Sequence, residues 1–85
     1  MKKHEWREKT PDGDVRYVAA IRQGAQWRFQ SRLKSEDYWT RPDSLNLDDL
    51  QELREILWNK CQRRRVPIEQ VFEIDALIKQ AEKHP

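Results

Sequence analysis

The side chains that most often carry catalysis or hold metal ions are few and scattered in this chain. His4 and His84 lie near opposite ends, and Cys61 has no second cysteine or histidine at the spacing of metal ligands. Asp48 and Asp49 form an acidic pair, but their place in the first turn of a predicted helix is explained by the helix dipole. With only two glycines, the chain has no glycine-rich phosphate loop. We therefore expect no enzyme activity, no cofactor and no metal.

The remaining chemistry is that of arginine and aromatic side chains, and the charges are unevenly distributed. Residues 1–34 carry nine Lys or Arg against four Asp or Glu, residues 35–62 carry three against seven, and residues 63–85 carry five against four. The net charge of +2 therefore conceals a basic first part and an acidic middle. A basic surface with interleaved aromatic rings, here Tyr17 and Trp39, could hold phosphates while bases stack. The candidate nucleic-acid surface consists of Arg16, Tyr17, Arg22, Arg28, Arg32, Arg63, Arg64 and Arg65.

The densest basic run is Arg63 to Arg65, at the predicted end of the first helix. The helix dipole favours cations there, and arginine side chains can donate hydrogen bonds to the last carbonyl groups. Capping alone explains the run, and contact with phosphate or with an acidic partner is the alternative interpretation.

The first half of the chain contains the strands that must position the other arginines. Three β-rich runs are predicted at residues 3–9, 15–23 and 26–33. They are separated by turn signals at Thr10-Pro11-Asp12-Gly13 and at Gly24-Ala25. A short fourth strand is expected at residues 38–41. The pattern predicts an antiparallel meander of three to four strands over about residues 3–41.

The turn at Gly24-Ala25 decides which sheet face is buried. By alternation alone, the arginines of both neighbouring strands share the open face, namely Arg16, Arg22, Arg28 and Arg32. A two-residue turn instead pairs Gln23 with Gln26. The buried set is then Val18, Ala20, Trp27 and Phe29, and the open set is Tyr17, Ala19, Ile21, Arg28, Gln30 and Arg32. We favour the two-residue turn because glycine suits its first position, whereas a three-residue loop or a bulge restores the first version.

The second half of the chain predicts two helices, over about residues 46–63 and 67–83. Asn46 is placed as the N-cap of the first helix, and Val66-Pro67 interrupts the pattern between the two. The apolar stripe of the first helix is Leu47, Leu50, Leu53, Leu57 and Cys61. The short link predicts a helical hairpin packed on one sheet face.

The second helix is apolar over more than half of its circumference, which exceeds what one sheet contact needs. Either the two helices pack against each other through this surplus, or it binds another protein or a second copy of this chain. Trp58 lies about 100° around the first helix from Leu57, at the edge of its stripe, where a large side chain either packs on the second helix, the more common use, or anchors a partner. The candidate partner surface is therefore Trp58, Phe72, Ile74 and Leu77.

The composition places these elements in one small α+β domain, residues 1–85. The chain is 36% hydrophobic and 38% charged, and its longest uncharged apolar run, Tyr17 to Ile21, is far too short to cross a membrane. No export signal is recognised, and a lone cysteine fits a reducing compartment. We expect a cytoplasmic, bacterial protein without membrane contact. The favoured function is binding of a protein partner or self-association, and the alternative is nucleic-acid binding through the arginine-bearing sheet face.

Overall fold

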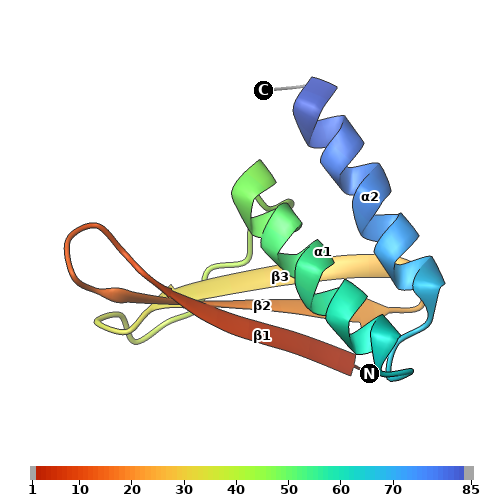
Figure 1. The fold of residues 1–85 in the computed structure, drawn as a ribbon. Helices are drawn as coiled ribbons and strands as arrows, with labels where there is room; N and C mark the ends of the chain where they lie inside the picture. Colours follow the sequence, from red (N-terminus) through yellow and green to blue (C-terminus); the bar gives the residue numbers. More distant parts are fainter. Residues whose placement is uncertain (1, 84–85) are drawn as a thin grey trace. The chain divides into compact units, whose positions relative to one another are not determined.

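The computed structural model describes residues 2–83, in which three strands are followed by two helices (Figure 1). The elements are β1 (Lys2–Lys9), β2 (Val15–Gln23), β3 (Gln26–Leu33), α1 (Leu47–Gln62) and α2 (Ile68–Lys83). The predicted α+β class is thereby confirmed. The chain divides into two compact units, Met1–Ser44 with the sheet and Leu45–Pro85 with the helices. Packing of the helical hairpin on one sheet face stays a prediction.

The sheet is an antiparallel meander in which β2 lies between β1 and β3 (Figure 1). The expected fourth strand is reduced to an isolated bridge between Ser31 and Thr40, with N–H to O=C distances of 2.9 and 2.8 Å. Their hydroxyl oxygens also lie 3.1 Å apart. Pairing stops at Thr40, because the next residue in line to donate to β3 is Pro42, which has no N–H.

The turn between β2 and β3 has two residues, as predicted. Gln23 pairs with Gln26, and Gly24 adopts a φ of +61° while Ala25 does not have a positive φ. A positive φ at the first turn position alone is typical of a type II′ hairpin and favours glycine there. The register that follows places Ala20 opposite Phe29 and Val18 opposite Ser31.

This register gives the sheet one buried and one basic face. On the buried face His4, Val18, Ala20 and Phe29 are each at most 5% exposed, while Trp27 is half-buried. We call the other side the basic face. Its members include Lys3, Glu5, Arg7, Lys9, Tyr17, Ala19, Ile21, Arg28, Gln30 and Arg32. Ala19, expected to be exposed, is fully buried between its ladder partners Glu5 and Gln30.

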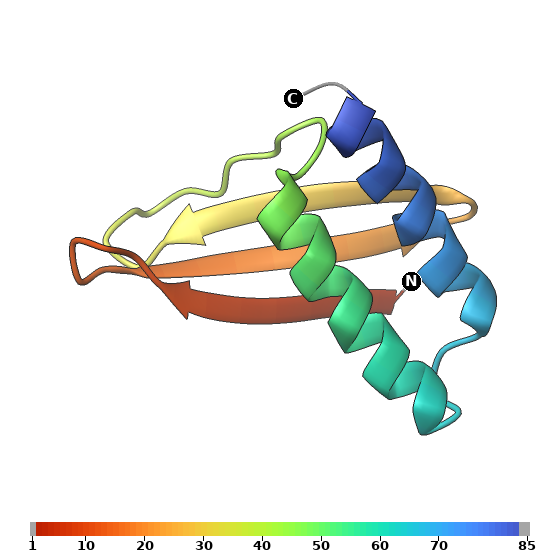
Figure 2. The same cartoon turned by 45° about the horizontal axis from the view of Figure 1, so that its top comes forward.

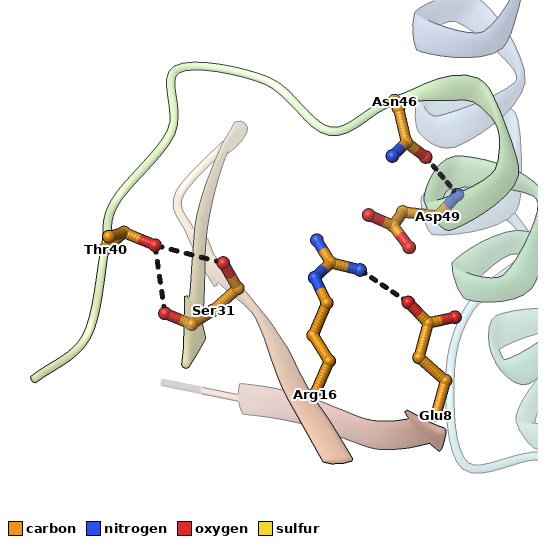
Figure 3. A network of polar contacts seen from close by, with 6 residues as sticks. All are labelled: Glu8, Arg16, Ser31, Thr40, Asn46 and Asp49. Carbon is orange, nitrogen blue, oxygen red and sulfur yellow. Dashed lines mark hydrogen bonds and ion pairs between the residues drawn. The ribbon is translucent and has the colours of Figure 1, made fainter. Parts of the chain in front are cut away.

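The helix α1 begins where the sequence predicts. The Asn46 side chain accepts a hydrogen bond of 2.8 Å from the N–H of Asp49 (Figure 3), which satisfies one of the free donors of the first turn. Leu45 and Leu50, which flank the cap, are both buried. They occupy the two positions of a hydrophobic staple.

The end of α1 is a Schellman motif with an arginine where glycine is usual. Arg65 donates its N–H to the carbonyl of Lys60 at 2.8 Å, and Arg64 donates to that of Cys61 at 2.9 Å. Arg64 has a φ of +59°. The chain therefore turns into α2 through a conformation that is strained for arginine.

The two helices run antiparallel beside each other (Figures 1 and 2). On α1 the buried leucines are Leu50, Leu53 and Leu57, and on α2 the buried apolar residues are Val71, Ile74 and Ile78. Arg54 of α1 and Asp75 of α2 form an ion pair across the hairpin, with the Nε and Oδ1 atoms 2.5 Å apart.

Candidate functional site

Basic side chains gather on one face of the sheet because of the strand register. Among the described strand residues, the basic face carries five cations and a single acid, Glu5. The cations are Lys3, Arg7, Lys9, Arg28 and Arg32. All but Arg32 are exposed, and Lys3 forms an ion pair of 2.7 Å with Glu5. The basic face is therefore positively charged, and four of its five cations are exposed to solvent.

Two of the arginines expected on this surface lie elsewhere. Tyr17, Arg28 and Arg32 share the basic face, but Arg16 and Arg22 fall on the buried face because successive side chains of β2 alternate. Arg16 forms an ion pair of 2.8 Å with Glu8, directly opposite it on β1 (Figure 3). The continuous arginine face that simple alternation predicts is thus wrong, and the mixed aromatic and basic face is confirmed.

Arg32 lies between two aromatic rings. Its guanidinium carbon is 5.2 Å from the ring centroid of Tyr17 and 5.6 Å from that of Trp39. Tyr17 is the partner of Arg32 in the ladder, and the bridge between Ser31 and Thr40 places Trp39 next to Arg32 on the other side. The three side chains form a row across the sheet, which we call the Tyr17–Arg32–Trp39 stack.

Hydrogen bonds fix the segment that carries Trp39. Arg32 donates from Nη1 to the carbonyl oxygen of Glu36 at 2.6 Å. The Glu36 carboxylate accepts from the N–H of Leu33 at 3.1 Å and from the Tyr38 hydroxyl at 3.3 Å. These bonds hold Glu36 and Tyr38 at the end of β3, directly before Trp39.

A further hydrogen bond ties this segment to the first turn. The Ser35 hydroxyl donates to Asp14 Oδ2 at 2.6 Å. This bond, followed by that from the N–H of Val15, holds the pKa of Asp14 below its ordinary value. In the same turn, the Thr10 hydroxyl donates to Asp12 and lowers the pKa of that carboxyl.

The other predicted basic cluster lies at the link between the helices. Arg63, Arg64 and Arg65 are all exposed, and their backbone N–H groups close the end of α1. Backbone N–H groups of any residue can do this, so capping by the arginine side chains stays a prediction.

The predicted partner surface is smaller than expected. Ile74 is 0% exposed because it shares the buried stripe of α2 with Val71 and Ile78, so it cannot meet a partner, and Leu77 is half-buried. Trp58 and Phe72 are 41% and 60% exposed.

These two aromatic residues lie at a similar level along the helical hairpin. Trp58 follows Arg54 by one turn, and Phe72 precedes Asp75 by about one turn. Because the helices run antiparallel and Arg54 pairs with Asp75, both steps go in the same direction along the hairpin. We call Trp58 and Phe72 the hairpin patch.

No group of three or more His, Cys, Asp or Glu side chains could hold a metal ion within residues 2–83. Cys61 is half-buried, and His84 lies outside the described residues. No helix in the described part is long and apolar enough to cross a membrane.

Sequence reasoning missed the three β1 cations and the role of Glu36. Lys3, Arg7 and Lys9 occupy alternate positions, which is a signal that they share one face. That this face is the basic face follows only from the pairing of Arg7 with Tyr17, which lies on that face. The position of Glu36 carries no such signal, because it depends on how the segment after β3 folds back.

The fold and its basic face define a small α+β protein with a three-stranded antiparallel sheet and two C-terminal helices. Comparison with known protein families, with curated proteins and with solved structures finds no match to this chain.

Proposed function

We propose that this protein is a nucleic-acid-binding module and that the basic face of its sheet contacts the phosphate backbone. The supporting observation is the strand register, which gathers Lys3, Arg7, Lys9, Arg28 and Arg32 around a single acid. Long cationic side chains on a pleated surface can each approach a different phosphate, and the release of counterions drives such binding.

The test is a titration of a labelled oligonucleotide, followed by fluorescence anisotropy at several salt concentrations. Binding at micromolar protein should weaken steeply as salt rises. The double variant Arg7→Ala, Arg28→Ala removes two exposed cations of the basic face and should lower the slope of log K against log salt by about 1.5.

The matched control removes two exposed cations of α2, Lys79→Ala with Lys83→Ala. Its slope should stay within experimental error of the parent chain. Absence of binding at low salt would overturn the proposal, as would an equal loss in both double variants. A loss seen only when Arg63, Arg64 and Arg65 are replaced by Ala would move the contact to the helix link and overturn the role of the sheet.

Self-association is the second candidate function, favoured by the hairpin patch. Trp58 and Phe72 are both exposed, and large aromatic side chains are enriched among the residues that contribute most to protein interfaces. Glu55 and Glu69, one turn before Trp58 and Phe72, are exposed and give the patch acidic flanks. A second copy offers a complementary surface in its basic face.

Sedimentation velocity tests this candidate. The parent chain should show a concentration-dependent increase in sedimentation coefficient that high salt reduces and that Trp58→Ala with Phe72→Ala abolishes. A monomer at about 100 µM and low salt would exclude it, since the exposed charges are least screened there.

A further inference from the structure

We propose that Trp39 is a base-stacking residue, so that the basic face selects single-stranded nucleic acid over duplex. This inference rests on the proposed function and adds the class of nucleic acid. It is carried by the Tyr17–Arg32–Trp39 stack, in which Trp39 is 40% exposed at the edge of the basic face.

The position of the ring in the row leaves one side of it for a ligand. Arg32 lies next to Tyr17 through the ladder and next to Trp39 through the bridge at Ser31 and Thr40. The guanidinium therefore occupies the side of the indole that faces the sheet. Because Trp39 is 40% exposed, we assign the opposite side of the indole as the side on which a flat group stacks.

The ring is also held in place before any ligand arrives. Thr40, its neighbour, is fixed to Ser31 by two backbone hydrogen bonds of 2.8 and 2.9 Å. Arg32 itself is fixed by its bond to the Glu36 carbonyl, and Glu36 is fixed by Leu33 and Tyr38. A ring that is already ordered loses little conformational entropy on binding, which favours its use as a platform.

The Trp39 ring and the cations of the basic face together define the chemistry of the ligand. In a duplex the flat faces of the bases are stacked on one another, so an aromatic side chain outside the helix cannot reach them. An unpaired base can stack on Trp39 while its neighbouring phosphates lie over the cations of β3 and β1, such as Arg28 and Arg7. Unpaired bases of RNA and of DNA share this chemistry.

The experiment compares three labelled ligands at one low salt concentration: a single-stranded DNA and a single-stranded RNA of about 12 nucleotides, and a DNA duplex of the same length. The parent chain should bind both single strands more tightly than the duplex. Trp39→Leu should weaken binding of the single strands about tenfold and leave duplex binding unchanged. Trp39→Phe, which keeps a ring, should recover most of the loss.

Gln80→Leu is the control, because Gln80 is an exposed, uncharged residue of the helical unit and belongs to neither candidate surface. It should leave all three affinities unchanged. Circular dichroism and the thermal midpoint establish that each variant is folded, and quenching of tryptophan fluorescence by the single strands should disappear in Trp39→Phe.

Each contrary outcome identifies what has failed. Binding of none of the three ligands overturns the proposed function. Binding of all three with equal affinity, or an equal loss on all three in folded Trp39→Leu, overturns base stacking and leaves phosphate binding by the basic face in place. A difference between the RNA and DNA arms identifies which strand the site prefers.

Discussion

Arg32 has a structural role as well as a charge. It is half-buried, it contacts two rings, and its Nη1 atom donates to the carbonyl of Glu36. A planar guanidinium can make ring contacts and directional hydrogen bonds at the same time, which a lysine ammonium cannot. We therefore interpret Arg32 as the residue that positions Trp39, and the exposed cations around it as the phosphate contacts.

Asp14 gives a prediction at the same scale. Ser35→Ala removes the largest cause of its lowered pKa, so the pKa of Asp14 should rise towards its ordinary value. Because the pKa is lowered in the folded chain, the contribution of Asp14 to stability is complete above the ordinary aspartate pKa. It is lost as pH falls through the lowered value.

Carboxyl titration by NMR measures this shift. The pKa of Asp12 serves as the internal control, because its main cause is the Thr10 hydroxyl and Ser35→Ala should not change it. An unchanged pKa of Asp14 in Ser35→Ala would show that the Ser35 bond does not hold the segment to the turn.

Among the elements, the link between α1 and α2 allows the sharpest test of local strain. Arg64 has a φ of +59°, where an L side chain is disfavoured, whereas Arg63 has a φ of −92°. Arg64→Gly should raise the free energy of unfolding by about 1 kcal/mol. Arg63→Gly should lower it by about 0.5–1 kcal/mol, because glycine there adds only flexibility to the unfolded chain.

Urea unfolding of both variants measures the difference. A less stable Arg64→Gly would mean that the Arg64 side chain contributes more than its backbone strain costs. The arginine run would then need an account beyond capping.

Elements with local signals are predictable from the sequence, and those that depend on distant contacts are not. Gly24 specifies the two-residue turn and, through it, the whole register of β2 and β3. Asn46 marks the start of α1 in the same local way. The predicted fourth strand is only an isolated bridge, because its pairing with β3 is limited to Thr40. Ile74 is buried while Phe72 is exposed, and this difference depends on how α2 packs.

For the whole molecule, the segregation of charge along the sequence becomes a segregation by face within the sheet. The net charge of residues 1–34 indicates a basic first part, but Arg16 and Arg22 do not lie on the basic face. Lys3, Arg7 and Lys9 replace them, because β1 pairs in register with β2. A surface that is both basic and aromatic is therefore a property of the pairing, and composition alone does not reveal it.

The most direct test of the central claim is an NMR map of the full chain with a short single-stranded oligonucleotide added in steps. The backbone amides of the basic face, those of Arg7, Arg28 and Arg32 foremost, and the indole N–H of Trp39 should shift together and saturate at one stoichiometry. The amide resonances of α2 should not shift. Shifts confined to residues 63–65, or no shifts at micromolar to millimolar oligonucleotide, would contradict the account.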